Sequence, residues 1–162
     1  GTPGTGKTQT SQAAAERTGL RHVNVGDLIK QNKCYEGKDE TFDSYIIDDD
    51  EVCDLLEPII EEGGCIVDFH SCELFPERWF ELILVLRANT DVLYDRLSER
   101  GYNEKKLSEN VECEIMQIVL EEAKESYDSN LVHELQSNDL NDLENNVERI
   151  AQWLENWKSN NQ

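Results

Sequence analysis

The first eight residues, GTPGTGKT, match the pattern G-x-x-x-x-G-K-[ST] of phosphate-binding loops. In such a loop, glycines allow the backbone to turn its amide N–H groups toward a phosphate. Gly4 and Gly6 are such glycines, and Thr5 lies between them. Lys7 would reach the β- and γ-phosphates, and the Thr8 hydroxyl would bind Mg²⁺. A helical pattern begins directly afterwards, so its dipole would add to the attraction. The motif predicts a nucleoside triphosphate site.

A carboxylate follows an apolar run in CIVDFH, residues 65–70. Asp68 would hold a magnesium-bound water at the end of a strand. His70 comes two residues later and would share the face of Asp68 if the strand continues, where it could orient a water or donate to phosphate. A structural histidine is the alternative for His70.

Arginines gather in RANTDVLYDRLSERGYNEKK, residues 87–106. Arg96 and Arg100 are four residues apart on a predicted helix and could grip a polyphosphate together. Ion pairs with Asp95 or Glu99 are the alternative. Arg100 stands beside Gly101, so it could close over a transferring phosphoryl group.

Two further motifs, GDLIK and FPERW, offer groups for a second nucleotide. Lys30 and Arg78 could hold its phosphate, Gly26 lies in the same motif as Lys30, and Asp27 could cap the short helix that follows. We expect Trp79, next to Arg78, to lie in the core.

Alternating helical and strand patterns predict one α/β domain with a central parallel sheet flanked by helices. The predicted strands are 21–25, 65–69, 81–87 and 131–135. The predicted helices are 7–18, 26–32, 48–62 with a kink or a break at Pro58, 89–100, 108–127 and a final helix. An irregular polar stretch is expected up to about Ile47. The final helix carries an apolar stripe that we expect to pack on the sheet, formed by Leu140, Leu143, Val147, Ile150, Leu154 and Trp157.

A phosphate-binding loop normally follows a buried strand, yet no residue precedes Gly1. Without that strand, its two neighbours would stand about 10 Å apart with unpaired backbone groups. We therefore expect the natural protein to have upstream residues that form this first strand.

The formal net charge of −20 argues against direct contact with nucleic acid or an anionic membrane and favours a basic protein partner. The five cysteines contain no C-x-x-C pair, which indicates reduced thiols rather than a disulfide framework or a zinc site.

The segments GTPGTGKT, VNVGDLIK, VDFHSCELFPERWF, VLYDRLSERGYNEKKL and LENNVERIAQWLENW resemble the adenylate kinase isoenzyme 6 family, the coilin-interacting nuclear ATPases, over nearly the whole chain. The resemblance implies a P-loop kinase fold with a five-stranded parallel sheet. It also implies a monophosphate-binding insertion at about 24–47 and a lid at about 99–109. It places the ATP loop on Gly4, Gly6, Lys7, Thr8 and Gln9, the acid and histidine on Asp68 and His70, and the lid arginine on Arg100.

The resemblance further implies transfer of phosphate from ATP to AMP with Mg²⁺, accompanied by ATP hydrolysis. Its expected partners are a basic protein of the small ribosomal subunit and coilin, its expected location is nucleus and cytoplasm, and we expect a monomer. The family commonly has arginine where this chain has Lys30, which replaces a bidentate phosphate contact with a point charge. Two alternatives stay open, an ATP-switched ribosome assembly factor and a kinase for a small metabolite such as a sugar acid.

Overall fold

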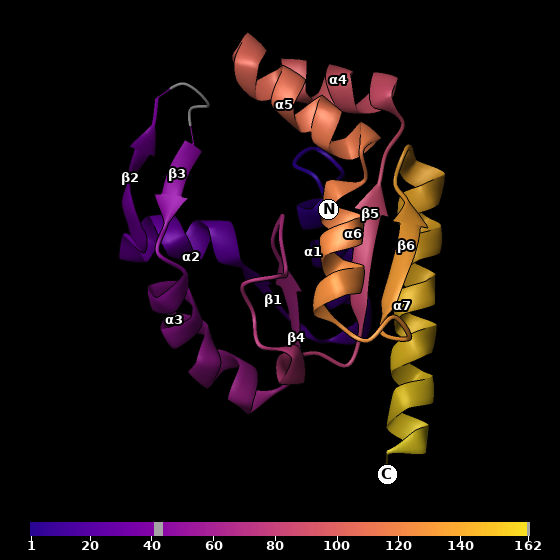
Figure 1. The fold of residues 1–162 in the computed structure, drawn as a ribbon. Coiled ribbons are helices and arrows are strands. Elements are labelled where there is room, and N and C mark those ends of the chain that lie inside the picture. Colours follow the sequence, from indigo (N-terminus) through magenta and orange to yellow (C-terminus); the bar gives the residue numbers. More distant parts are fainter. Residues whose placement is uncertain (41–43, 162) are drawn as a thin grey trace.

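The computed structural model describes residues 1–40 and 44–161 of the chain, whose course is drawn in Figure 1. Strands and helices alternate along most of it, as the sequence predicted. The elements are α1 (Lys7–Thr18), β1 (Arg21–Asn24), α2 (Val25–Asn32), β2 (Tyr35–Asp39), β3 (Ser44–Ile47), α3 (Asp49–Glu62), β4 (Cys65–Asp68), a short 3₁₀ helix η1 (Glu77–Trp79), β5 (Ile83–Arg87), α4 (Thr90–Glu99), α5 (Glu104–Ile115), α6 (Ile118–Ser126), β6 (Val132–Gln136) and α7 (Leu140–Asn160).

Two parallel strand pairs form the centre of the molecule. β1 pairs with β4, with Val23 opposite Val67, and β5 pairs with β6, with Leu86 opposite Leu135. The helices flank these pairs, with α1 packed along α7 and α6 lying over β5 and β6 (Figure 1). The prediction of an α/β fold with parallel strands flanked by helices is confirmed.

A groove of about 510 Å³ separates the two parallel pairs. β4 lines it with Val67, β5 with Leu84, and α7 with Trp153. In the part of the chain that the structure describes, β4 and β5 do not pair with each other, so four parallel strands stand in two pairs where one five-stranded sheet was expected. Gly1 lies beside Leu86 of β5, at this gap. The upstream strand stays a prediction.

The stretch expected to be irregular contains an antiparallel hairpin. β2 pairs with β3, with Tyr35 opposite Ile47, and residues 41–43 between the two strands lie outside the described part. The prediction was wrong because this segment has little of the apolar alternation that marks a half-buried strand. Side chains along β2 alternate between half-buried and exposed, so backbone pairing defines the hairpin rather than a buried face.

The long helix predicted over 108–127 is in fact two helices. α5 ends at Ile115 and α6 begins at Ile118, and between them Gln117 adopts a left-handed backbone with φ of 57°. α5 packs its Leu107 and Val111 against α4, whereas α6 packs against β5 and β6. α5 and α6 therefore pack on different surfaces, and one straight helix could not reach both. By contrast, α3 continues through Pro58, so the break that was one of the two expectations there was wrong, whereas the alternative, a kink, stays a prediction.

The apolar stripe of α7 is buried only in its middle. Leu154 and the neighbouring Ala151 are buried, whereas Leu140 at the start of the helix is 67% exposed and Trp157 near its end is 37% exposed. The helix packs along α1, and its Trp153 faces the groove. The prediction that the whole stripe packs on the sheet was therefore wrong at both ends.

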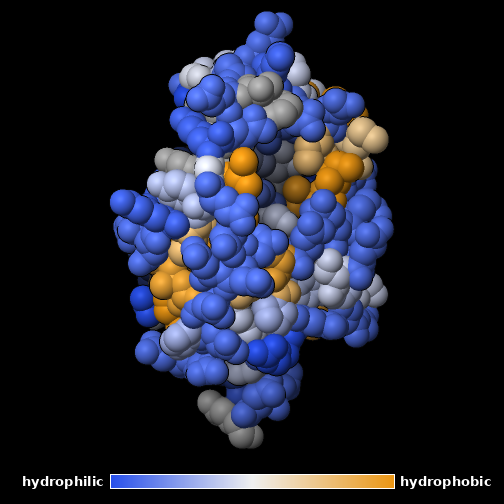
Figure 2. All heavy atoms as spheres, turned by 60° about the vertical axis from the view of Figure 1, so that its left-hand side comes forward, coloured by the Kyte–Doolittle hydropathy of each residue, from blue (hydrophilic) through white to orange (hydrophobic). Residues whose placement is uncertain are grey.

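Figure 2 shows a mostly hydrophilic face on the side of the β2–β3 hairpin, with hydrophobic residues gathered in separate patches. None of the helices described here combines the length and the apolar content needed to cross a membrane. All five cysteines are free thiols.

Aromatic residues fix the chain between β4 and β5. Trp79 is buried, as predicted, and stacks on Phe75 with 5.8 Å between ring centroids. Tyr127, at the end of α6, directs its hydroxyl to the carbonyl oxygens of Cys72 at 2.6 Å and Phe75 at 3.0 Å. Burial raises the pKa of Tyr127 above its ordinary value, so the phenol stays a donor at neutral pH. One buried hydroxyl thus holds the loop after β4 against α6.

Replacing Tyr127 with Phe removes this donor and leaves two carbonyl oxygens without it. We expect the free energy of unfolding to fall by about 1–3 kcal/mol, because an unsatisfied buried acceptor costs about that much. Urea unfolding followed by fluorescence measures the change. Tyr94→Phe is the matched control, since Tyr94 is 53% exposed, and equal losses in the two variants would contradict the role given to Tyr127.

Candidate functional site

The phosphate-binding loop has the backbone that its motif predicts. Gly4 and Gly6 have φ values of 92° and 84°, in the left-handed region that favours glycine, and α1 begins at Lys7. Gly4 is also packed closely, since a Cβ there would lie 2.8 Å from a methyl of Leu93 and 2.9 Å from one of Leu97. The loop is therefore pressed against α4 at a point where no side chain fits.

Lys7 lies half-buried at the start of α1, and its Nζ donates to the carbonyl oxygen of Thr2 at 3.1 Å. The pKa of Lys7 is lowered to about 8, mainly by burial; the Asp68 carboxylate opposes this shift, and the positive charge of Arg100 adds to it. A cation held with few compensating contacts is suited to accept a triphosphate, whose negative charge would restore its ordinary ionisation.

Asp68 ends β4 and is buried, and three donors surround its Oδ2. The Thr8 hydroxyl donates at 2.8 Å, His22 Nε2 lies at 3.2 Å, and the Asn24 amide lies at 3.5 Å. His22 and Asn24 come from β1, which runs beside β4, and Thr8 comes from the first turn of α1. The carboxylate and the loop hydroxyl, both predicted from sequence, thus lie together. Gln9 follows Thr8 in the same turn and is exposed.

The pair Thr8 and Asp68 fits a magnesium ion bound with a triphosphate. Mg²⁺ prefers oxygen ligands and is usually held by one or two protein groups together with substrate phosphates and waters. The described residues contain no group of three or more His, Cys, Asp or Glu side chains that could hold a metal by themselves. The donor set therefore suits an ion that arrives with its nucleotide.

His70 lies at the rim of this site, with its ring 4.2 Å from that of Phe69 between centroids. The His70 side chain is exposed, yet partial removal of water from its ring, followed by the charge of Lys7, lowers its pKa below the ordinary value. The imidazole is therefore neutral at neutral pH and would act as a hydrogen-bonding group rather than as a cation.

The two predicted arginines have different surroundings. Arg96 Nη1 donates to the carbonyl oxygens of Gly4 at 3.2 Å and Ser137 at 2.8 Å, so it joins the phosphate loop to the end of β6. Arg100 follows the last residue of α4, and its side chain is exposed. Arg96 therefore supports the backbone of the phosphate loop, whereas Arg100 is accessible at the turn before α5.

An open cleft of about 380 Å³ adjoins the loop. Its lining includes Thr8 of α1, His22 of β1 and Asp27 of α2. Gly26 and Lys30 lie on the same short helix. Asp27 does not cap that helix, contrary to expectation, because the Asn24 side chain is the cap and accepts from the Asp27 amide at 3.0 Å.

Arg78 is not brought to this cleft. Its guanidinium donates to Glu57 of α3 at 2.9 Å, and it lines the groove between the strand pairs. The other predicted residues for a second nucleotide lie on α2. A role of Arg78 in binding that nucleotide's phosphate stays a prediction without a matching contact.

Three polar residues of this region were not singled out from sequence, namely His22, Asn24 and Glu114. The first two contact Asp68, which is 46 and 44 residues away, and Glu114 contacts Thr2 across 112 residues. His22 and Asn24 alternate with Val23 in a parallel strand beside the one that ends in Asp68. Strand alternation next to a carboxylate was the one signal that could have found them.

Comparison with known proteins agrees with this geometry. Residues 1–117 match the family model described as "AAA domain". The chain is 48% identical over 160 residues to a protein of Schizosaccharomyces pombe named "Adenylate kinase isoenzyme 6 homolog", covering 99% of this chain and 91% of the relative. A protein of the same name from Dictyostelium discoideum is 45% identical over 161 residues, covering 99% and 92%.

Among solved structures, shikimate kinase from Bacteroides thetaiotaomicron superposes with a TM-score of 0.60 at 16% sequence identity, covering 95% of this chain and 94% of that one. This likeness supports the fold.

Gly4→Ala tests the packing of the loop on α4. The added methyl group would meet Leu93 and Leu97, and the residue would have to keep a positive φ, so we expect a loss of at least about 2 kcal/mol in the free energy of unfolding. Thermal and urea unfolding measure it. Gly37→Ala is the control, because a Cβ at Gly37 would meet no heavy atom within 4 Å among the described residues. A Gly4→Ala protein as stable as the Gly37→Ala protein would contradict the close packing.

Proposed function

The chain belongs to the adenylate kinase isoenzyme 6 family, and we propose that it transfers the γ-phosphoryl group of ATP to AMP, producing two molecules of ADP. The chain is a P-loop kinase by fold and family. The proposal names AMP as the acceptor and adds a slower hydrolysis of ATP when AMP is absent.

One observation carries the proposal. The loop hydroxyl of Thr8, the carboxylate of Asp68 and the cleft that reaches Asp27 of α2 are contiguous. A triphosphate bound by the loop would therefore present its terminal phosphate toward the cleft, where a second nucleotide would bind. Transfer between phosphates depends mainly on positioning and on neutralising charge.

In this proposal each residue has a defined task. The loop amides from Gly4 to Thr8 bind the triphosphate, and Lys7 neutralises its β- and γ-oxygens. Thr8 and Asp68 hold Mg²⁺, which supplies neutralisation of charge on the phosphates. Neutral His70 donates to a phosphate oxygen or orients a water, and Arg100 closes over the transferring group from the lid at about 99–109.

Binding of AMP is assigned to the α2 segment. Gly26 and Asp27 would contact the nucleotide, and Lys30 would contact its phosphate. Lys30 is exposed at the second turn of α2, so a flexible ammonium would contact the phosphate as a point charge. Arg78 would join it only after leaving Glu57.

A second role is proposed from the charge of the molecule. A net charge of −20 favours a basic protein partner, and the family resemblance points to a protein of the small ribosomal subunit, to coilin, and to the nucleus and cytoplasm. In that role ATP would act as a conformational switch during ribosome assembly, and kinase turnover would be incidental. A monomer that contacts neither nucleic acid nor membrane directly is part of this proposal.

The test is the dependence of ADP production on AMP. With Mg·ATP, adding AMP should raise ADP output well above the ATP-only rate, with two ADP formed per AMP consumed. Lys7→Ala should lower the rate by at least about 100-fold, because it removes a charge that is positioned for the transferring phosphate. ³¹P NMR or a coupled enzyme assay measures the products.

Lys158→Ala is the matched control, since Lys158 is exposed near the end of α7. CMP and dAMP in place of AMP measure the selectivity of the acceptor site. An ADP output that AMP never raises would exclude the kinase activity and favour the ATP-switched role. Phosphate appearing on a sugar-acid hydroxyl would favour a metabolite kinase.

The low pKa of Lys7 predicts a pH dependence. The ammonium is present below about pH 8 in the free protein and is lost above it, so kcat/KM for ATP should fall as pH rises through about 8. This ratio reports ionisation of the free protein, whereas kcat reports the complex, in which the triphosphate raises the pKa of Lys7. Therefore kcat should persist to higher pH.

Lys7→Arg provides the control for this profile, because a guanidinium keeps its proton throughout the range. Its residual kcat/KM should not fall between pH 7 and 9.5. A wild-type profile that is flat over the same range would contradict the assignment.

A further inference from the structure

Glu114 is a buried carboxylate that the proposed reaction does not use. It lies in the last turn of α5, and its side chain is 4% exposed. Buried carboxylates are rare unless they are paired and hydrogen-bonded. The contacts that satisfy Glu114 therefore identify the parts of the molecule that it connects.

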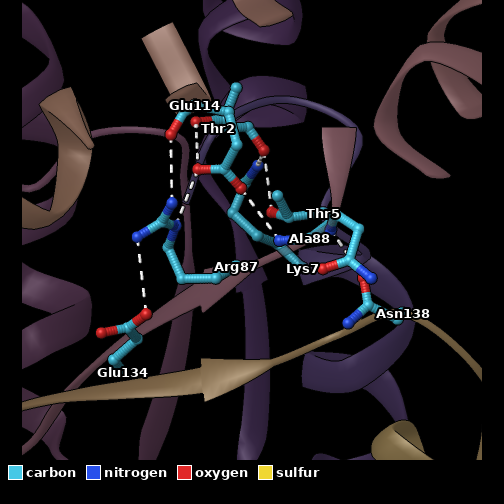
Figure 3. Close-up of polar contacts among 9 residues, drawn as sticks. Thr2, Thr5, Lys7, Arg87, Ala88, Glu114, Glu134 and Asn138 are labelled. Atoms are coloured by element: carbon cyan, nitrogen blue, oxygen red, sulfur yellow. Dashed lines mark hydrogen bonds and ion pairs between the residues drawn. The ribbon is translucent and has the colours of Figure 1, made fainter. Parts of the chain in front are cut away.

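Three donors from two segments converge on the two oxygens of Glu114 (Figure 3). Oε1 accepts from the Thr2 hydroxyl at 3.3 Å and from Arg87 Nε at 2.9 Å. Oε2 accepts from the backbone amide of Ala88 at 2.9 Å. Arg87 also donates from Nη2 to the Glu114 carbonyl oxygen at 3.0 Å and pairs with Glu134 at 3.4 Å.

Thr2 connects this carboxylate to the phosphate loop. Its hydroxyl donates to Glu114, while its carbonyl oxygen accepts from Lys7 Nζ at 3.1 Å and from the Thr5 hydroxyl at 2.8 Å. Thr2 is 1% exposed, so these contacts are shielded from water. Through its hydroxyl and its carbonyl oxygen, Thr2 therefore links Glu114 to the ammonium group of Lys7.

Glu114 also joins the two ends of the α4–α5 arm, by which we mean residues 90–115. Ala88, whose amide it binds, lies two residues before α4 begins, and Glu114 itself lies one residue before α5 ends. The turn between the two helices carries Arg100, whose charge contributes to the lowered pKa of Lys7. Glu114, at the root of the arm, is thus bonded to Thr2, and Thr2 also binds Lys7.

We propose that Glu114 is a positioning residue, which through Thr2 aligns the root of the α4–α5 arm with Lys7 and so determines how Arg100 approaches a bound triphosphate. This inference rests on the proposed phosphoryl transfer and adds to it a residue that touches no substrate. Small errors in alignment at a distance from the reacting atoms are enough to slow such a transfer.

A purely structural role makes a different prediction. Removing part of a buried ion-pair network would then lower stability, and activity would change only as much as the fraction of folded protein. Glu114→Gln removes the charge that pairs with Arg87 and turns an NH₂ group toward the donors of either Oε1 or Oε2, so it mixes the two roles. Thr2→Val is the sharper variant, because it keeps the shape of the side chain and removes only the hydroxyl.

The experiment measures kcat, KM for ATP and Tm for Thr2→Val, Thr2→Ser and Thr10→Val in the full chain. Thr10 is the matched control, since its buried hydroxyl has no hydrogen-bond partner among the described residues. We expect Thr2→Val to lower kcat about tenfold with KM within about twofold, because the loop amides are left intact. Its Tm should fall by at most about 4 °C. Thr2→Ser should recover most of the lost kcat, and Thr10→Val should change kcat and KM by less than about twofold.

A second readout does not depend on turnover. Hydrogen exchange of the amides in the 100–103 turn, measured with and without Mg·ATP, should show protection in wild type and Thr2→Ser and much less in Thr2→Val. A Thr2→Val protein with unchanged kcat and the same protection would overturn the proposal. Protection by Mg·ATP that is present in wild type and Thr2→Ser and lost in Thr2→Val, in a protein that never consumes AMP, would refute the proposed reaction and support the positioning role.

Discussion

The carbonyl oxygens of the phosphate loop must find donors inside the protein, because a loop that turns its amides toward a ligand turns carbonyls the other way. Thr2 O receives the Thr5 amide at 3.2 Å, the Thr5 hydroxyl and Lys7 Nζ, and Gly4 O receives Arg96. Through these two oxygens the loop is bonded to Lys7 and to Arg96 of α4, and Arg96 also binds the end of β6. The second constraint on the loop is steric, since Gly4 leaves room only for hydrogen against α4.

The groups around the phosphate loop explain how an acidic molecule can bind an anionic ligand. A net charge of −20 repels phosphates at long range, but screening limits that repulsion to about 8–10 Å at ordinary ionic strength. Close to the loop, Lys7 is half-buried and Arg100 contributes positive potential. Asp68 and Glu114 are held by donors of their own, so the nearby carboxylates are partly neutralised by hydrogen bonds.

Two strand pairs and one helical arm position different groups of the site. β1 and β4 bring His22 and Asn24 to Asp68, while β5 and β6 bring Arg87 to Glu114. The break at Gln117 allows α5 to lie along α4 while α6 covers β5 and β6. A continuous helix through this point could not both form the arm and cover the strands, so the left-handed residue is required by two separate packing surfaces.

The sequence by itself determined the phosphate loop with Thr8 at its end, the α/β order of elements and the place of Asp68 at the end of a strand. These features are local, because glycine spacing sets the backbone of the loop and an acid at the end of an apolar strand lies at the edge where parallel strands carry their ligands. The identity of the helix cap, Asn24 rather than Asp27, was missed within the same few residues, since both side chains are suitable acceptors and only the backbone angles distinguish them.

Only the tertiary structure decided which distant groups complete the site. Glu114 reaches Thr2 across 112 residues, Arg96 reaches Gly4 across 92, and Arg78 pairs with Glu57 instead of joining α2. No periodicity encodes such contacts, because a charged residue on a helix has the same local signature whether it faces water or a buried donor. The choice is made by the packing of one element on another, and that is a property of the whole chain.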